Sequence, residues 1–403
     1  DPPTRRRRQR QMCIRDRRIL FVVDAIKGRN GVGAYFQDLV SHLKDHVAQV
    51  ELVQPCMEEP HPCQGASMPI PGDPTQRLFF PKVRELSALV WEMKPHVIVI
   101  PGPGIFSMIG YWIARKWGIP VCVTFQTDYN RLVELYWGRR LARLAGGLLN
   151  WVNRTLFRGS DTAATICESM IAQARAAGAR NPQLVGTPLA REFVNTPVTR
   201  LHDSVRRVCY VGRLAAEKNI ESFLALAASR PDLQFEIAGD GPLRNKVEQA
   251  CKASANLTFH GWCRRQQVVE ILDRCQVLVL PSSVEAFGTV ALEAMARERL
   301  VITTPACGIN EWPALASGLW IMEPRESLKQ TLDRLQSLSP VVRDLKAKQA
   351  RQAALTMNRD AIEHWAAVLG QCAQMVPAAN RSLPSPTLAL LRRLSSNYAR
   401  SAL

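Results

Sequence analysis

A strand-like run that leads through a small-residue turn into a helix, at residues 276–296, constrains the fold more than any other segment of this chain. The run Gln276-Val-Leu-Val-Leu280 is apolar throughout, which is typical of a strand buried on both faces in a parallel sheet. After the turn, apolar residues from Leu292 onward recur at helical spacing. A helix that begins directly after a strand presents unpaired backbone N–H groups and the positive end of its dipole. The segment therefore predicts an α/β fold with an anion site at the helix start, near Gly288 and Thr289.

This strand–turn–helix alternation recurs along the chain and restarts once. It begins with Arg18-Ile-Leu-Phe-Val-Val-Asp24 and restarts with Val208-Cys-Tyr-Val211, after a linker that contains Pro and Thr. A chain of 403 residues is too long for one ordinary core. We therefore predict two Rossmann-like domains, at residues 19–197 and 198–357, that face each other across a cleft. A long helical pattern follows at residues 358–376.

The net charge of +17 lies largely in the two ends of the chain. Residues 1–18 hold eight Arg and two Asp, and residues 377–403 hold four Arg and no acid. A pI near 9.8 ordinarily suggests nucleic-acid binding, but charge in the tails weakens that inference, and we expect no nucleic-acid partner. The eleven cysteines include no C-x-x-C pair, which favours reduced, buried thiols over disulfides or a zinc site.

Both ends of the chain are expected to be flexible basic tails. Residues 1–18 lack apolar periodicity, which predicts disorder. Their piece Gln-Met-Cys-Ile-Arg-Asp-Arg resembles translated sequencing-adapter sequence, so we expect this tail to be non-native and exclude it from functional inference. A basic arm for membranes or nucleic acids is the alternative. Residues 377–403 are rich in Pro and Ser and then carry a short basic amphipathic piece.

Charged residues of both signs gather around the predicted anion site. Glu285 precedes the helix and Glu293 lies within it, eight residues apart, so two acceptors can flank an anion. Such an arrangement suits a nucleotide-sugar, which has hydroxyl groups at both ends and phosphates between them. Arg213 and Lys218 flank a turn at the end of another strand, where they can clamp a diphosphate.

These segments resemble the motifs of the retaining glycosyltransferases of family 4, the group 1 glycosyl transferases, which have the GT-B fold. Residues 285–293 resemble the signature E-x-F-G-x(4)-E, residues 212–219 resemble G-R-L-x-x-E-K-N, and residues 239–242 resemble G-D-G-P. The resemblance implies that Glu285 contacts sugar hydroxyls and Glu293 the ribose. It further implies an N-terminal acceptor domain, a C-terminal donor domain and a final helix that crosses back to the first domain.

The first half departs from the family pattern at one position. Gln126-Thr-Asp-Tyr129 follows the predicted strand at 120–125 and resembles F-H-T-D-F, in which the histidine lies near the reacting sugar. Glutamine can donate a hydrogen bond but cannot take a proton at neutral pH, so a base role at this position is in doubt. In a front-side retaining mechanism the leaving phosphate takes the acceptor proton, and Gln126 then serves to orient the donor sugar. In the resembled family the Gly-rich turn after the first strand passes close to the donor phosphates or the acceptor, which makes Gly31 and Gly33 candidates here.

Two segments bear on membrane contact. Residues 97–114 carry no charge, but Pro101-Gly-Pro-Gly104 interrupts them, which predicts a strand, a loop and a helix of a soluble core. Residues 131–158 hold six Arg and one Glu among aromatic and leucine residues. This pattern fits an interfacial helix on an anionic membrane as well as an ordinary helix with solvated arginines. We expect a cytoplasmic protein with peripheral contact to the inner membrane face.

The resemblance and the site chemistry together predict a retaining glycosyltransferase. It would move a hexose from a nucleotide-sugar, expected to be a UDP-sugar, to a lipid or glycan acceptor. We expect no cofactor and no metal, because the chain contains no Asp-x-Asp pair to chelate a metal on the diphosphate. The alternatives are a nucleotide-sugar 2-epimerase of the same fold and a catalytically impaired nucleotide-sugar-binding protein.

The predicted site residues fall into three groups. The catalytic candidates are Glu285, Arg213, Lys218 and Gln126. The donor-binding candidates are Gly31, Gly33, Gly212, Gly241, Phe287, Gly288, Thr289, Val290 and Glu293. The candidates for an acceptor or membrane face are Asp128, Tyr129, Arg139, Arg140 and Arg143.

Overall fold

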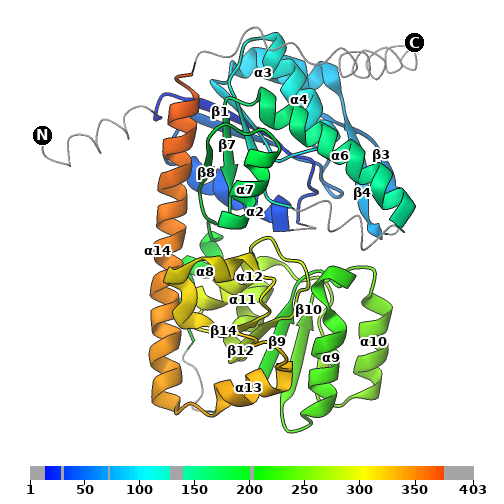
Figure 1. The fold of residues 1–403 in the computed structure, drawn as a ribbon, viewed down its shortest axis with the longest axis vertical. Helices are drawn as coiled ribbons and strands as arrows, with labels where there is room; N and C mark the ends of the chain where they lie inside the picture. The colour runs from blue at the N-terminus through cyan, green and yellow to red at the C-terminus, as the bar shows by residue number, and fades with distance from the viewer. Residues whose placement is uncertain (1–13, 29–30, 71–72, 128–138, 200–203, 376–403) are drawn as a thin grey trace, which may run out of the picture.

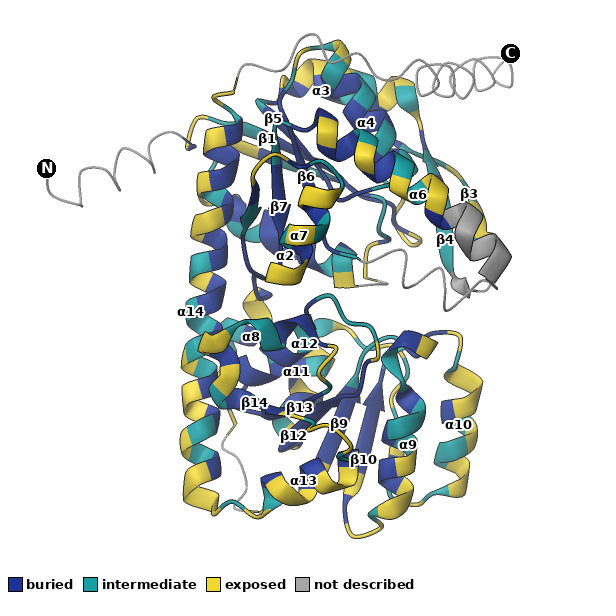
Figure 2. Cartoon of the chain, viewed as in Figure 1, coloured by how far each residue is buried: buried dark blue, intermediate teal, exposed yellow. Residues whose placement is uncertain are grey.

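Two six-stranded parallel sheets, each covered by helices, form the two halves of the molecule (Figure 1). The protein is seen in a computed structural model that describes residues 14–28, 31–70, 73–127, 139–199 and 204–375. The central strands of the two sheets, such as β5, β6, β12 and β13, are buried, whereas β3 is not, and most helices expose one face (Figure 2). The predicted α/β class and the two Rossmann-like domains are confirmed.

The first sheet has the strand order β2-β1-β5-β6-β7-β8, with every neighbouring pair parallel. An antiparallel pair, β3–β4, lies outside this sheet. The strands of this half are β1 (Arg18–Val22), β2 (Gln49–Val53), β3 (Gln64–Ile70), β4 (Asp73–Pro81), β5 (Val97–Ile100), β6 (Val121–Phe125), β7 (Thr162–Thr165) and β8 (Pro182–Leu184). Its helices are α2 (Gly31–Leu43), α3 (Val83–Met93), α4 (Ile105–Lys116), α6 (Arg139–Gly159), α7 (Glu168–Ala176) and α8 (Arg191–Asn195).

The second sheet has the order β11-β10-β9-β12-β13-β14, again all parallel. In chain order this is 3-2-1-4-5-6, the order of a doubly wound dinucleotide fold. Its strands are β9 (Arg207–Val211), β10 (Gln234–Ala238), β11 (Leu257–Phe259), β12 (Val277–Leu280), β13 (Leu300–Thr303) and β14 (Leu319–Ile321). Its helices are η1 (Ala216–Lys218), α9 (Ile220–Ser229), α10 (Arg244–Ala253), α11 (Arg265–Arg274), α12 (Thr289–Ala296), η2 (Gly308–Glu311), η3 (Pro313–Gly318) and α13 (Leu328–Gln336).

The uncharged segment at residues 97–114 forms a strand and a helix, as predicted. All four residues of β5 are buried, and α4 begins after the loop that Pro101 and Gly104 shape. Asp24, at the end of β1, accepts hydrogen bonds from the backbone N–H of Phe106 at 2.7 Å and of Ser107 at 3.0 Å. The carboxylate thus satisfies free donors at the start of α4. Gly104 leaves room for this approach, since a Cβ there would overlap the Asp24 carboxyl group.

One helix, α14 (Pro340–Cys372), spans both halves and begins 18 residues before the predicted crossover helix at 358–376. At 33 residues it is about 50 Å long. It packs on α12 and η3 of the second half and on α2, β6 and β7 of the first. The Trp365 indole donates to the Tyr35 hydroxyl at 2.7 Å, and that hydroxyl donates to the Gly186 carbonyl at 2.9 Å. Figure 1 shows α14 running along one side of the two halves.

Two buried arginines, Arg297 and Arg299, fasten the linker between the halves. The Arg297 guanidinium is fully buried, pairs with Asp273 at 2.6 Å and donates to the carbonyls of Thr196 and Pro197. Arg299 donates to Asp273 as well. Each buried charge therefore has a partner that offsets its lost hydration.

The N-terminal tail corrects one prediction. Residues 1–18 were expected to be disordered, yet Ile14 is buried in the core and the N–H of Arg17 donates to its carbonyl at 3.0 Å. The prediction is therefore wrong for residues 14–18, because one apolar side chain in a basic tail still gains free energy from burial. Residues 1–13 and the predicted tail at 377–403 lie outside the described residues.

Candidate functional site

The loops that follow β9 and β12 meet because those two strands are parallel neighbours in the second sheet. The strand order reverses between them, and ligands of open α/β sheets bind at such a reversal, beyond the carboxyl ends of the strands. The loop after β9 carries Arg213 and Lys218, and the loop after β12 carries Glu285. Residues 67 positions apart in sequence are thereby brought together.

Lys218 and Glu285 form a direct ion pair at the centre of this site. The Lys218 Nζ lies 2.5 Å from the Glu285 Oε2, with side chains 21% and 13% exposed. The Ser282 hydroxyl donates to the same oxygen at 3.3 Å. Both hydrogen bonds are thus made by Oε2, and among the described residues Oε1 makes none. A half-satisfied carboxylate that still reaches solvent can accept from a ligand hydroxyl.

Arg213 lies on the same loop as Lys218, after β9, and is held by Glu217. The Arg213 Nη1 is 3.0 Å from the Glu217 Oε1, and the Glu217 side chain is only 5% exposed. Burial lowers the pKa of the Arg213 guanidinium, and the Glu217 carboxylate opposes that shift. The guanidinium keeps its charge, because the ordinary pKa of arginine is far above neutrality. The site therefore presents two cations at the carboxyl edge of the sheet.

Glu217 also joins the two loops through its backbone, a role that the sequence did not suggest. Its carbonyl accepts from the N–H of Ser283 at 2.8 Å and of Val284 at 3.3 Å. In the sequence, Glu217 is one position of the motif at residues 212–219 and was assigned no role. Its partners on the Glu285 loop, Ser283 and Val284, lie 66 or more positions away, so no local pattern could assign it the role of joining that loop to Arg213.

The start of α12 has the geometry expected of an anion site. Gly288 is the N-cap residue at φ +101°, a conformation that side chains rarely adopt, and a Cβ there would lie 2.8 Å from Leu280. Thr289 and Val290 follow as the first, half-buried residues of the helix, and the buried Phe287 precedes them. No side chain caps this helix start among the described residues, so its N–H groups remain for a ligand.

The loop after β10, which carries the donor-binding candidate Gly241, packs closely against the loop after β9. Gly241 has φ +157°, and a Cβ on it would lie 2.5 Å from the Leu214 carbonyl oxygen. Gly239, two residues earlier, would place a Cβ 1.8 Å from the Gly212 carbonyl oxygen. Only glycine permits this approach. Gly212 directly follows β9, and its N–H donates to the Ala238 carbonyl at 3.0 Å.

Glu293 lies on the same helix as the anion site but has neighbours of its own. Its pKa is raised to about 7, chiefly by burial; Arg265 opposes this shift, and the nearby Asp38 and Glu192 add to it. Arg265 pairs with Asp38 at 2.6 Å. Glu293 thus lies in a different electrostatic environment from Glu285.

Strand ends of the first sheet hold the remaining described candidates. Gly31 and Gly33 are in the first turn of α2, directly after the loop that follows β1. Gln126 follows β6 and is 4% exposed, and its amide Nε2 has no hydrogen-bond partner among the described residues. A buried amide without a partner is costly unless something else satisfies it. Asp128 and Tyr129 lie outside the described residues.

Both halves of the chain match families of glycosyltransferases. Residues 30–190 match the glycosyl transferase 4-like domain, and residues 195–353 match the glycosyl transferases group 1. The chain belongs to glycosyltransferase family 4. The predicted family and the GT-B fold are confirmed.

Curated relatives match this family 4 chain over about half its length. An alpha-D-kanosaminyltransferase of Streptomyces kanamyceticus is 26% identical over 52% of this chain and 59% of its own. A GDP-mannose-dependent alpha-mannosyltransferase of Mycolicibacterium smegmatis is 31% identical over 53% of this chain and 57% of its own. The matched segments thus span less than two thirds of these relatives.

Solved structures match this chain over nearly all of their own length. Sucrose-phosphate synthase from Thermosynechococcus elongatus has a TM-score of 0.66 at 18% identity, covering 89% of this chain and 98% of its own. Anabaena HepE in complex with UDP-glucose has a TM-score of 0.61 at 15% identity, covering 86% and 98%. At these identities the likeness establishes the fold.

The remaining observations concern the candidate arginines of α6, metal-binding groups and membrane-spanning helices. Arg139, Arg140 and Arg143 belong to α6, and their side chains lie outside the described residues. No group of three or more His, Cys, Asp or Glu side chains in the described part of the chain could hold a metal ion. Across the same residues, no helix combines the length and apolar character needed to span a bilayer.

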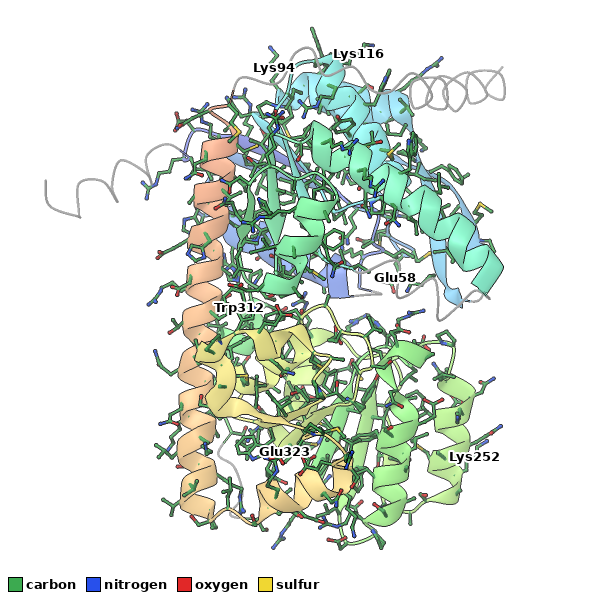
Figure 3. The ribbon with its side chains drawn as sticks, in the orientation of Figure 1. Glu58, Lys94, Lys116, Lys252, Trp312 and Glu323 are labelled. Atoms are coloured by element: carbon green, nitrogen blue, oxygen red, sulfur yellow. The ribbon has the colours of Figure 1, made fainter. Side chains whose placement is uncertain are left out.

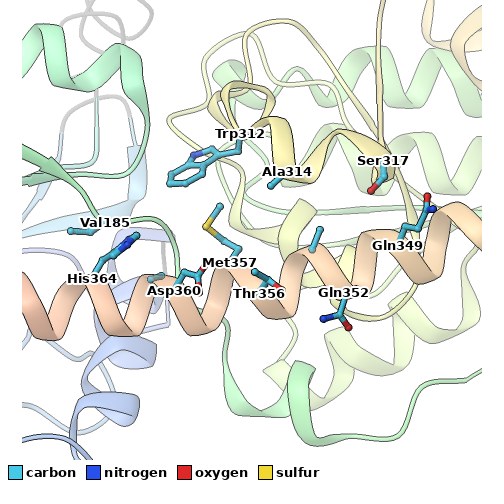
Figure 4. Close-up of a pocket in the computed structure, with 12 residues that line it drawn as sticks. Val185, Trp312, Ala314, Ser317, Gln349, Gln352, Thr356, Met357, Asp360 and His364 are labelled. Atoms are coloured by element: carbon cyan, nitrogen blue, oxygen red, sulfur yellow. The ribbon is translucent and has the colours of Figure 1, made fainter. Parts of the chain in front are cut away.

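A cavity of about 450 Å³ lies along α14. Its lining includes Val185, Trp312 and Met357, and Figure 4 shows them beside the long helix. Trp312 lies where the two halves meet (Figure 3), and its indole donates to the Ile166 carbonyl at 3.1 Å. None of the predicted site residues lines this cavity, so it is separate from the candidate site.

Proposed function

We propose that the protein is a retaining glycosyltransferase that moves a hexose from a nucleotide-sugar, with UDP-sugars as the expected donors, to a lipid or glycan acceptor. The observation that carries this proposal is the 2.5 Å contact between Lys218 and Glu285 beside Arg213 and the uncapped start of α12. One carboxylate with a free oxygen, two cations and unpaired N–H groups at a strand-order reversal suit a sugar attached to a diphosphate.

In the proposed reaction the diphosphate leaves from the anomeric carbon of the donor. The bond between that carbon and the phosphate oxygen breaks, and its electron pair stays on the phosphate. Arg213, Lys218 and the N–H groups of α12 oppose this charge, which is the part of the transition state that fixed dipoles stabilise best. Two side-chain cations and a helix start support departure of the diphosphate without a metal ion.

The acceptor hydroxyl attacks the same face of the sugar in this proposal. A new bond forms between the acceptor oxygen and the anomeric carbon, and the acceptor proton passes to the departing phosphate oxygen. Retention of configuration follows, and no protein base is needed. Glu285 then acts by accepting hydrogen bonds from sugar hydroxyls, with Lys218 keeping the carboxylate ionised and in place.

The residue at position 126 is compatible with this mechanism. Gln126 cannot remove a proton at neutral pH, but its buried, unpartnered amide Nε2 can donate to a sugar oxygen. We propose that it orients the donor sugar. Glu293, on the next turns of α12, is proposed to accept from the ribose hydroxyls.

The proposed lipid acceptor is supported by the surface of α6. On this helix, Leu148 is 59% exposed, and Arg154 and Arg158 are exposed as well. An exposed apolar residue beside cations on one helix supports peripheral contact with an anionic membrane and a lipid acceptor. Sedimentation with vesicles of phosphatidylglycerol and phosphatidylcholine tests this contact, and binding that is absent from the anionic vesicles would favour a glycan acceptor.

The decisive experiment screens nucleotide-sugars by thermal stabilisation and then by turnover. A ligand that binds only the folded state raises Tm by mass action, so the donor should stand out from its mono- and diphosphate analogues. Transfer to an acceptor extract with the stabilising donor, in the presence of EDTA, tests metal independence. NMR of the product tests retention through the configuration of the anomeric carbon.

Two other functions make different predictions in the same assay. A 2-epimerase would convert the nucleotide-sugar into its epimer without any acceptor. A catalytically impaired binding protein would be stabilised by the donor but would neither hydrolyse nor transfer it. Product analysis with and without acceptor therefore separates all three.

A further inference from the structure

Residues 307–312, which follow β13, hold the loop that carries Glu285. The N–H of Gly308 donates to the Glu285 carbonyl at 3.1 Å, and the N–H of Ile309 donates to the Phe287 carbonyl at 2.8 Å. We call residues 307–312 the connecting segment. The backbone position of the acid proposed for the sugar therefore depends on this segment.

The connecting segment is also fastened to the sheet of its own half. The Asn310 Oδ1 accepts from the Thr303 hydroxyl at 2.9 Å, and its Nδ2 donates to the Thr304 carbonyl at 2.8 Å, at the end of β13. The approach to the Glu285 loop requires glycine, because a Cβ on Gly308 would lie 2.0 Å from the Ala286 carbonyl oxygen. The sheet, the segment and the Glu285 loop thus form one connected unit.

The last two residues of the connecting segment contact the first half of the molecule. The Glu311 Oε2 accepts from the Ser169 N–H at 2.9 Å, and the Trp312 indole donates to the Ile166 carbonyl at 3.1 Å. Ile166 directly follows β7, and Ser169 is the second residue of α7. Figure 3 shows Trp312 where the two halves meet. Two successive residues of the second half thus bind one strand end of the first.

Glu311 supplies α7 with a hydrogen-bond acceptor from the other half. The N-cap residue of α7, Cys167, makes no side-chain cap hydrogen bond among the described residues. The first N–H groups of a helix have no partner within the helix, and a carboxylate is favoured at the positive end of the helix dipole. Glu311 provides both the acceptor and the negative charge from 142 positions away.

The strand end that the connecting segment contacts lies beside Gln126. Strands β6 and β7 are parallel neighbours, and Phe125 is aligned with Thr165. Gln126 and Ile166 are the next residues of the two strands, so both lie at the same edge of the first sheet. The connecting segment therefore joins the loop of Glu285 in the second half to the strand end next to Gln126 in the first.

We propose that Glu311 and Trp312 are positioning residues that set the distance between Glu285 and Gln126, the two proposed sugar contacts on opposite halves. Neither positioning residue touches the donor. They act through the connecting segment, which holds the Glu285 loop at one end and the first half at the other. A sugar held from two halves reacts only when both halves lie at a fixed distance. The inference rests on the proposed function.

The positioning role separates binding of the diphosphate from placement of the sugar. Arg213, Lys218 and the start of α12 all belong to the second half, so UDP binding does not depend on the contacts with the first half. Contact between the sugar and Gln126 does depend on them. Loss of the Glu311 or Trp312 hydrogen bond should therefore impair the use of UDP-glucose and leave the affinity for UDP unchanged.

The experiment compares Glu311→Ala and Trp312→Phe with matched controls. Trp312→Phe keeps an aromatic ring and removes the indole donor, and Glu311→Gln tests rescue, because its amide oxygen still accepts a hydrogen bond. One control is Glu248→Ala, which removes an exposed acid that pairs within the second half. The other is Trp91→Phe, at a tryptophan that is 67% exposed. Calorimetry gives the affinity for UDP, and transfer or hydrolysis gives kcat/KM for UDP-glucose.

We expect Glu311→Ala to lower kcat/KM for UDP-glucose by up to about tenfold, the most that loss of the Gln126 hydrogen bond costs. Trp312→Phe should act in the same direction, whereas Glu311→Gln and both controls should match the wild type. In a Gln126→Ala background, Glu311→Ala should cost little more. An unchanged kcat/KM, multiplicative losses, or an equal loss of UDP affinity would overturn the proposal, because a merely structural contact acts on both ligands alike.

Hydrogen exchange without ligand distinguishes failure of this proposal from failure of the proposed function. If the wild-type protein neither bound UDP nor turned over UDP-glucose, the assignment of that donor would fall, while exchange would still test the connecting segment. Faster exchange in both the first turn of α7 and the Glu285 loop for Glu311→Ala, but not for Glu248→Ala, supports the proposal. Unchanged exchange in the Glu285 loop would reduce Glu311 to a helix cap and overturn it.

Discussion

An acid at a strand end has opposite uses in the two halves of this molecule. In the first half, Asp24 follows β1, and both of its carboxylate oxygens accept hydrogen bonds from Phe106 and Ser107 at the start of α4. In the second half, Glu285 follows β12, and its two hydrogen bonds fall on one oxygen. A strand-end acid whose bonds are complete serves the fold, whereas one with an oxygen to spare, beside a cation, is available to a ligand.

The same contrast applies to the helix starts. The start of α4 is satisfied by Asp24 from across the sheet, although Gly104, its N-cap residue, has no side chain. The start of α12 also has a glycine, Gly288, but no side chain among the described residues reaches it. A glycine at the N-cap thus accompanies a closed helix end in one half and an open one in the other.

The largest effect is expected from Glu285→Ala, which removes the ligand-facing acid. Turnover should fall by about 10²- to 10³-fold, the usual cost of losing one fixed polar group at a transition state. Tm should stay close to the wild-type value, because the side chain is not a core residue. Steady-state transfer assays and thermal melts measure the two quantities.

Its control is Glu248→Ala, which removes an exposed acid that pairs with the exposed Arg244 in the donor half. That variant should match the wild type, since exposed ion pairs contribute little. Turnover of Glu285→Ala equal to that of Glu248→Ala would refute the site assignment.

A somewhat smaller effect, about 10²-fold on turnover, is expected from Lys218→Ala. Lys218 both fixes Glu285 and is proposed to oppose charge on the leaving phosphate. Because the two side chains touch, the double variant Lys218→Ala/Glu285→Ala should lose less than the product of the two single losses. Multiplicative losses would mean that the 2.5 Å contact has no role in turnover.

The third prediction concerns stability instead of turnover. Asp24→Ala leaves the N–H groups of Phe106 and Ser107 without partners, which should lower the free energy of unfolding by about 1–3 kcal/mol. Chemical denaturation measures this loss, and Asp45→Ala, an exposed acid on the same half, should lose much less. An Asp24→Ala variant that remains as stable as Asp45→Ala but loses transfer would place Asp24 in the site and end the contrast with Glu285.

Contacts between loops of neighbouring parallel strands could be predicted from the sequence. Arg213 and Glu285 could be assigned to one site because each lies in a family motif that follows a strand, and parallel strands end at a shared edge. Contacts that depend on distant partners could not be predicted. Asp24 caps a helix 82 positions away, and Arg265 reaches Asp38 in the other half. No periodicity encodes such pairs.

The burial of Arg297 and the first residue of α14 could not be predicted from the sequence either. Arg297 lies in a segment whose pattern gives no reason to bury an arginine, yet it is fully buried because Asp273 and two linker carbonyls surround it. The start of α14 was placed 18 residues late because its first half is buried mainly through alanines, such as Ala347 and Ala354. Alanine marks a helix face weakly, so the crossover helix was recognisable only from its apolar second half.

The smallest effect is expected from changing Gln126, which follows β6 in the first half. Like Glu285 in the second half, Gln126 has a side-chain atom without a hydrogen-bond partner among the described residues. The atom is the buried amide Nε2 of Gln126, so the first half also has a hydrogen-bond donor that a ligand can use. Gln126→Ala should raise the KM for the donor by about 2- to 10-fold, the worth of one neutral hydrogen bond, with little change in Tm. Gln126→His should restore donor binding and give the KM a pH dependence near the histidine pKa of about 6.5, which the wild-type residue cannot contribute. If Gln126→Ala binds the donor as tightly as the wild type, the unpartnered amide is a packing feature, and the ligand-facing polar groups are confined to the second half.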